Sequence, residues 1–161
     1  MRASEGQPGT LELDRFLPYR LSVLSNMVSQ SIASLYGERF QLSVTEWRVL
    51  AVLGRYPGLS AGEVAERTQM DKVAVSRAVA QLLAAGRIQR GTDRQDRRRS
   101  VLKLSARGTR VYREIVPLAQ ACEARLLSVL SPHERDQLDH IVGKLAGAGI
   151  SALREAINTP G

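Results

Sequence analysis

Arginine is concentrated in one short part of the chain. Six arginines and only two aspartates lie between Arg87 and Arg99. A guanidinium group can donate two parallel hydrogen bonds to a phosphate, and a narrow minor groove of DNA attracts inserted arginine side chains. The whole chain carries 23 lysines and arginines against 16 acidic residues, a formal net charge of +7. This basic balance favours an anionic partner, with nucleic acid first and an acidic membrane surface second.

A second group of residues that could bind DNA precedes this cluster. Asp71 has the side chain of a helix N-cap. The first turns of the helix that it would cap carry Lys72, Val73, Ala74, Ser76 and Arg77. Arg77 could reach the O6 and N7 atoms of guanine, or a phosphate, and Ser76 could serve a base or the backbone. The plainer alternative is that Lys72 and Arg77 are solvated charges on a helix surface.

The elements that would position these residues begin with two helices. The segment SAGE (residues 60–63) has the spacing of a capping box and predicts a short helix that ends at about Arg67. A tight turn over residues 68–70 separates it from the longer helix that begins at Asp71. That helix ends at Gly86, a glycine expected in the left-handed conformation. Four of its residues are expected to face inward: Val75, Ala78, Val79 and Leu82.

A β-hairpin is expected directly after these two helices. Residues 87–90 and 100–104 are short enough to be two strands, and the polar segment 91–99 would join them. A helix-turn-helix followed by such a hairpin is a winged helix, the hairpin being the wing.

Longer helical segments flank the winged helix. Residues 11 to about 36 repeat apolar side chains at helical spacing and form a continuous seam. The capping boxes SVTE (43–46) and SPHE (131–134) open two further helices. Between the hairpin and the second of these boxes, a long helix is expected over residues 105–130.

The predicted fold class is mainly α with a small β-hairpin wing: a winged helix-turn-helix plus a helical dimerisation region from both termini. We expect a disordered tail at residues 1–10, an N-terminal dimerisation helix at 11–40, a DNA-binding winged helix at 41–104 and C-terminal dimerisation helices at 105–157. The terminal seams are too extensive to cover only each other. This predicts a homodimer.

At this level of detail the chain resembles the multiple-antibiotic-resistance regulator (MarR) family of winged-helix transcription factors. The resemblance covers nearly everything from Leu13 to Leu145. It rests on LSVTEWRVL (42–50), MDKVAVSR (70–77), and DRQDRRR (93–99) followed by LSARG (104–108).

The resemblance implies a dimer in which each recognition helix enters a major groove and each wing reaches a flanking minor groove. The half-sites of a palindromic operator then lie about one helical turn, ~10 bp, apart. Many family members have Ser-Thr where this chain has Val73 and Ala74. The loss of two hydroxyls favours apolar contact with a thymine methyl group at that position.

The same resemblance assigns roles in the wing. By alignment to the family's Asp-x-Arg element, Arg98 is the tip residue and Asp96 the carboxylate that holds it. The resemblance implies that Arg94, Arg97 and Arg99 contact phosphates, which would make affinity fall steeply with salt. The alternative is a flexible basic loop that binds any polyanion.

Regulators of this family often bind a small aromatic acid between the dimer helices and the winged domain. The polar candidates near that junction are Tyr19, Asn26, Gln30, Trp47 and Arg48. An arginine could pair with a carboxylate and a tryptophan could stack on a ring, although a core role for Trp47 and a salt bridge for Arg48 are the simpler alternatives. The segment FLPYRLSVLSN (16–26) resembles regulators of aromatic-acid catabolism, some of which sense acyl-CoA thioesters.

Other functional classes find little support in the sequence. The single cysteine, Cys122, permits no internal disulfide and lies in an apolar stripe, where an inert packing role is expected. His133 and His140 alone do not make a metal site. No nucleophile–base arrangement or phosphate-binding loop is evident, so the chain is predicted not to be an enzyme and to need no cofactor. With no membrane span and no secretory signal, a cytoplasmic protein without a membrane partner is expected.

Two functional hypotheses therefore remain. The first is a dimeric repressor that binds double-stranded DNA at a pseudo-palindromic operator and is released by an aromatic acid or its CoA thioester. The second is a ligand-independent DNA-binding or architectural protein. Binding of single-stranded nucleic acid is disfavoured because aromatic residues make up only 4% of the chain and none lies in the basic hairpin.

Overall fold

The computed structural model describes residues 10–93 and 95–159. These residues form two compact units, the first ending at Ala119 and the second beginning at Gln120. The predicted tail at 1–10 lies outside the described residues except for Thr10, and the wing residue Arg94 lies outside them as well.

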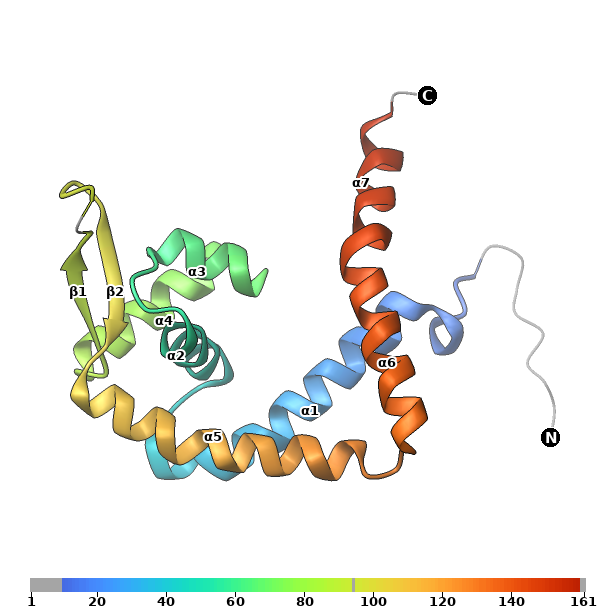
Figure 1. Cartoon of the computed structure of the whole chain (residues 1–161), viewed down its shortest axis with the longest axis horizontal. Helices are drawn as coiled ribbons and strands as arrows, with labels where there is room; N and C mark the ends of the chain where they lie inside the picture. Colours follow the sequence, from blue (N-terminus) through green and yellow to red (C-terminus); the bar gives the residue numbers. More distant parts are fainter. Residues whose placement is uncertain (1–9, 94, 160–161) are drawn as a thin grey trace. The chain divides into compact units, whose positions relative to one another are not determined.

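The structure is mostly helical, with one antiparallel hairpin (Figure 1). A 3₁₀ turn (Leu13–Arg15) precedes α1 (Leu17–Phe40), α2 (Val44–Arg55), α3 (Ala61–Thr68) and α4 (Lys72–Ala84). The hairpin consists of β1 (Ile88–Thr92) and β2 (Ser100–Leu104). After it come α5 (Ala106–Leu127), α6 (Pro132–Lys144), a π-helical turn (Leu145–Gly149) and α7 (Ile150–Asn158). The predicted mainly α fold with a small β-hairpin wing is confirmed.

All three predicted capping boxes are present. In each, the serine hydroxyl accepts the backbone N–H of the glutamate three residues later, and the glutamate side chain accepts the backbone N–H of the serine. The pairs are Ser43 with Glu46, Ser60 with Glu63, and Ser131 with Glu134. These reciprocal bonds satisfy donors that the first turn of a helix otherwise leaves unpaired, which explains why α2, α3 and α6 begin where they do.

The winged helix closes around one apolar core. The four residues expected to face inward on α4 are all buried, together with Val49, Leu50 and Leu53 of α2. Tyr36 of α1, Leu102 of β2 and Ile115 of α5 join the same cluster. The core thereby fixes one face of α4 and leaves its opposite face to solvent.

The hairpin is shifted relative to its prediction. Strand β1 begins at Ile88 rather than at residue 87 and runs to Thr92, paired with Ser100. The reason is that Arg87 turns inward and is only 8% exposed. Its guanidinium donates to the backbone carbonyls of Phe40 and Gln41 at the end of α1. Arg87 is therefore a buried structural cation and not a member of the exposed basic cluster.

The terminal helices also differ in detail from the expected ones. Helix α1 begins at Leu17, where Pro18 occupies its first turn, and ends at Phe40 before Gln41 in the left-handed conformation. The single last helix expected from the sequence is divided by the π-helical turn, which contains Gly147 and Gly149. Glycine has low helix propensity, so a wider turn is tolerated there. Among residues 10–159, Arg94 aside, no helix is long and apolar enough to cross a membrane.

Candidate nucleic-acid interface

Helix α4 presents a mixed polar and apolar surface at its first turns. The Oδ1 atom of Asp71 accepts the backbone N–H of Ala74 at 2.9 Å and caps the helix. Because Val75 and Ala78 point into the core, the opposite face is exposed, and Val73 reaches 64% exposure. A shallow hollow on this face is lined by Lys72, Val73, Ser76, Arg77 and Ala80. Ala74 is half-buried and the least accessible of the five residues predicted to face DNA.

The two cations of this face are available to an external anion. Within the part of the chain that the structure describes, neither Lys72 nor Arg77 forms an ion pair. Asp71 is the only nearby acidic residue on the same helix, and its carboxylate is used in the cap. The face is therefore a cationic surface with one exposed valine, which matches the edge chemistry of a major groove.

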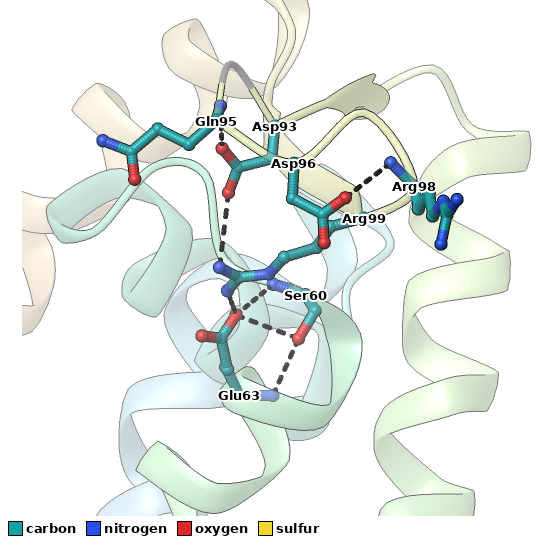
Figure 2. Close-up of polar contacts among 7 residues, drawn as sticks. All are labelled: Ser60, Glu63, Asp93, Gln95, Asp96, Arg98 and Arg99. Carbon is teal, nitrogen blue, oxygen red and sulfur yellow. Dashed lines mark hydrogen bonds and ion pairs between the residues drawn. The ribbon is translucent and has the colours of Figure 1, made fainter.

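The turn of the wing is shaped by aspartate side chains. Asp96 accepts the backbone N–H of Arg98 at 2.9 Å, and Asp93 accepts the backbone N–H of Gln95 at 2.8 Å (Figure 2). Asp96 thus holds Arg98 through the main chain and not through its guanidinium. Among the described residues, Arg97 and Arg98 have no ion-pair partner, and both are exposed.

Arg99 lies in a different environment from the other wing arginines. Its guanidinium pairs with the carboxylate of Glu63 on α3 and lies 3.3 Å from Oδ2 of Asp93 (Figure 2). The backbone N–H of Ser60 and then the Arg99 guanidinium lower the pKa of Glu63 from 4.5 to about 2. The same hydrogen bond to Glu63 raises the pKa of Arg99. The side chain of Arg99 thus faces two carboxylates, and the sequence analysis predicted neither contact.

The predicted effector residues divide into two groups. Trp47 packs between Tyr36 and Tyr112, with ring centroids 5.7 and 6.1 Å away. Arg48 donates to the hydroxyl of Ser29 at 2.8 Å. Burial raises the pKa of Tyr36 to about 12, so its phenol stays neutral beside this arginine. The hydrogen bond from Arg48 to Ser29 joins α2 to α1. The aromatic group of Tyr36, Trp47 and Tyr112 connects these two helices to α5.

The other predicted effector residues lie on the exposed part of α1. Tyr19 lines an open hollow there with Leu17, Leu21 and Leu24. Asn26 and Gln30 are exposed and do not line this hollow. The described residues therefore do not gather the five candidates into one cavity. The aromatic partners of Trp47 were missed because Tyr36 and Tyr112 are distant from it in sequence.

Comparison with known proteins finds a family match for part of this winged helix. Residues 40–99 match the sequence profile of the MarR family. This segment holds α2, α3, α4 and most of the wing. The winged-helix segment thus resembles the MarR family in sequence over residues 40–99. The relatives and solved structures that match this chain are described as transcriptional regulators.

Two relatives share part of the chain. The HTH-type transcriptional regulator BilQ of Clostridium symbiosum is 30% identical over 93 residues, which are 58% of this chain and 65% of BilQ. The HTH-type transcriptional repressor MdtR of Bacillus subtilis is 35% identical over 100 residues, 62% of this chain and 64% of MdtR. The chain thus matches slightly less than two thirds of the length of these relatives.

Solved MarR structures share the fold over most of the chain. A MarR/EmrR family regulator from Acinetobacter sp. ADP1 has a TM-score of 0.79 at 26% identity, covering 88% of this chain and 99% of that one. The S. aureus MepR–DNA complex has a TM-score of 0.72 at 24% identity, covering 83% and 98%. CouR from Rhodococcus jostii RHA1, bound to p-coumaroyl-CoA, has a TM-score of 0.73 at 19% identity, covering 86% and 96%.

Proposed function

We propose that this protein is a sequence-specific, DNA-binding transcription regulator that works in the cytoplasm as a MarR-type dimer. The observation that carries the proposal is the exposed first part of α4, where Lys72 and Arg77 lie free of ion pairs among the described residues. The wing of the same winged helix presents Arg97 and Arg98, likewise exposed. A recognition helix beside a basic hairpin matches the major and minor grooves of duplex DNA.

Each exposed residue has a role in this proposal. Arg77 binds guanine or a phosphate, Ser76 binds a base edge or the backbone, and Lys72 binds a phosphate. Val73 is well placed for a thymine methyl group because its side chain is largely exposed. Half-buried Ala74 contributes at most an apolar edge.

In the wing, Arg98 enters a minor groove and Arg97 contacts a phosphate. Arg94, which lies outside the described residues, is expected to contact a phosphate as well. The guanidinium of Arg99 is already paired with two carboxylates and is therefore left out of this contact set.

A homodimer is the second part of the proposal. Helix α1 exposes a series of large apolar side chains, and α6 and α7 do the same within the second unit. On α1 these residues are Leu17, Tyr19, Leu21, Val23, Leu24, Met27 and Leu35. Helices that expose this much apolar surface generally bury it against a partner. A two-fold dimer would present two α4 helices to the half-sites of a palindrome, about 10 bp apart.

Repression that is relieved by a small aromatic acid or its CoA thioester is the third part. Two similar proteins support this part: the relative MdtR is a transcriptional repressor, and CouR, which shares the fold, binds p-coumaroyl-CoA. In this chain the aromatic group at Trp47 and the guanidinium of Arg48 offer stacking and charge for such a ligand. A ligand releases DNA only if it binds more tightly to a dimer geometry in which the spacing of the two α4 helices does not match the half-sites.

Two observations favour a ligand-independent DNA-binding protein instead. Tyr19, Asn26 and Gln30 do not share a cavity with Trp47 and Arg48 in the described part of the chain. In addition, Arg48 already has a hydroxyl partner in Ser29. This second candidate keeps the DNA interface and loses only the effector.

Fluorescence-anisotropy titration tests both candidates. The probes are a duplex from the promoter region of the protein's own gene and a scrambled duplex of the same composition. We expect the promoter duplex to bind at least about tenfold more tightly at physiological salt. The titration is repeated with aromatic acids and their CoA thioesters. Weakening by one compound supports the effector, and no response to any of them supports the ligand-independent candidate. Equal binding to both duplexes would contradict sequence-specific regulation.

A further inference from the structure

The wing and α3 are joined by one charged bridge. Arg99 is the last residue before β2, and its guanidinium lies between Glu63 on α3 and Asp93 at the start of the wing turn (Figure 2). The middle of β2 is also held by two backbone bonds: Gly58 donates to Leu102, and Leu102 donates to Leu59. These backbone bonds fix the middle of the hairpin, whereas the Arg99 bridge acts nearer to the turn.

Both carboxylates of the bridge are themselves held in place. Oε2 of Glu63 accepts the backbone N–H of Ser60 at 2.7 Å and its hydroxyl at 2.9 Å. Asp93 accepts the backbone N–H of Gln95 at 2.8 Å through its other oxygen. Because a guanidinium is a rigid, planar donor, Arg99 between two anchored acceptors ties the turn of the wing to the first turn of α3.

The bridge joins one positive charge to two negative charges, so its net charge is negative. Arg99 therefore adds little to the field that attracts DNA, and the bridge as a whole opposes it. Simple electrostatics therefore predicts that removing the charge of Glu63 strengthens binding to a polyanion. A role in positioning the wing predicts the opposite sign.

We propose that the Arg99–Glu63–Asp93 bridge is a positioning device that holds the wing in its DNA-binding orientation, so that Glu63 increases DNA affinity without touching DNA. This inference rests on the proposed function. A wing released from α3 would have to be ordered again on each binding event, and the free-energy cost of that ordering would weaken DNA binding. Isolated surface ion pairs contribute little to folding stability, so the effect should appear in DNA binding more than in unfolding.

The decisive variant is Glu63→Gln. Glutamine also fits the third position of a capping box, so the start of α3 is preserved while the charge is lost. The matched control is Glu66→Gln, which removes the same charge from an exposed position on the same helix. Affinity is measured by anisotropy on the promoter duplex and the scrambled duplex. We expect Glu63→Gln to bind the promoter duplex about tenfold more weakly, and Glu66→Gln to bind it equally or slightly more tightly.

Arg99→Gln and the double variant complete a mutant cycle. If the bridge positions the wing, the double variant binds no more weakly than Arg99→Gln alone, because one broken bridge cannot be broken again. The salt dependence of binding stays unchanged in all three variants. If Arg99 instead contacts a phosphate, Arg99→Gln lowers the slope of log affinity against log salt by about 0.9, and Glu63→Gln tightens binding. This second pattern overturns the inference.

Thermal unfolding of every variant separates positioning from a loss of folding. Cooperative unfolding near the wild-type temperature together with weaker promoter binding supports the inference. Should Glu63→Gln lose cooperative unfolding, Arg99→Gln leaves the cap of α3 intact and tests the bridge from its other end. A wild type that binds no duplex overturns the proposed function and the inference together. A wild type that binds the promoter with Glu63→Gln binding as tightly overturns the inference alone.

Discussion

Arginine has three roles in this small winged helix, and the surroundings of each side chain decide which. Arg87 is buried and donates to carbonyls at the end of α1, and burial lowers its pKa. Arg99 is half-exposed and bridges two carboxylates. Arg77 is exposed on the face of α4 and has no ion pair among the described residues. Only the last kind is suited to an external ligand.

Arg77 therefore gives the first prediction. Replacement by alanine is expected to cost about 1–3 kcal/mol of promoter binding and to relax base preference at one position of each half-site. Anisotropy titrations on duplexes with single base changes measure both effects. Arg110→Ala removes an equal charge from an exposed position on α5 and serves as the control. Equal losses in both variants would show that Arg77 contributes only general charge.

Arg97 is expected to behave differently from Arg77, since a phosphate contact carries no base information. Arg97→Ala should weaken promoter and scrambled duplexes alike and reduce the salt slope by about 0.9. Titrations at several salt concentrations measure the slope. A change confined to the promoter duplex would contradict the phosphate contact.

Glu63 predicts a pH dependence of stability. Its pKa in the folded protein is about 2, below the ordinary value of 4.5. The carboxylate therefore stabilises the fold above about pH 4.5, and this contribution is lost as the pH falls toward 2. Its side chain is 38% exposed, so we expect the contribution to be below about 1 kcal/mol. Urea unfolding of wild type and Glu63→Gln should differ near neutral pH and converge in acid. A difference that does not change with pH would contradict this origin.

Residue roles were predictable from sequence only where the partners are close along the chain. The cap formed by Ser60 and Glu63 follows from a four-residue motif. The second partner of Glu63, Arg99, is contributed by the wing, and no local pattern connects the two positions. For the same reason the sequence does not distinguish the buried Arg87 from the other arginines of residues 87–99.

Among the elements, the hairpin and α5 are joined by a close packing contact at Gly108. Gly108 in the first turn of α5 lies against the backbone of Arg87, and an added Cβ would come within 1.8 Å of the Arg87 carbonyl oxygen. The same carbonyl accepts the backbone N–H of Ser105 at 3.0 Å. Because the atoms that an added Cβ would meet belong to the backbone, it can be accommodated only if α5 moves away from β1.

Gly108→Ala is accordingly expected to destabilise the protein by about 2 kcal/mol or more. The control is Gly62→Ala on α3, where the nearest atom to an added Cβ is the hydroxyl of Ser60 at 3.9 Å. That change should be neutral or stabilise by up to about 1 kcal/mol, because alanine favours a helix. Urea unfolding measures both. Similar free energies of unfolding for the two variants would show that α5 moves without cost.

Elements with strong end signals were predicted well. The capping boxes located α2, α3 and α6, and Gly86 adopts the left-handed conformation expected of it, with φ at 65°. Where such signals were weak, the prediction failed. Nothing marked the change to a π-helical turn at Leu145–Gly149, and strand β1 starts late because a long-range contact redirects Arg87.

For the whole molecule, the proposed dimer depends on the apolar face of α1. Leu24 is 52% exposed in the single chain. Leu24→Glu is expected to convert the dimer to monomer and to lower promoter affinity at least about tenfold, because one half-site is then bound alone. Sedimentation velocity measures the mass. Val73→Glu also places a carboxylate at an exposed valine, on α4, and should remain dimeric. A dimeric Leu24→Glu protein would show that α1 does not form the interface.

The architecture of the chain could be predicted from the sequence, whereas an effector site could not. Apolar periodicity and capping describe how one chain folds, and the winged helix follows from them. A ligand site between helices depends on side chains from α1, α2 and α5 meeting in space. The group at Trp47 shows this, since Tyr36 and Tyr112 come to it from opposite sides of the sequence.

Hydroxyl-radical footprinting of the protein on its own promoter region tests the central claim most directly. A dimer that reads DNA with two α4 helices and two wings should protect two symmetric segments about one helical turn apart, with flanking minor-groove protection from the wings. Uniform protection along the duplex, or none at concentrations that saturate anisotropy, would contradict a sequence-specific regulator and leave a protein that binds DNA by charge alone.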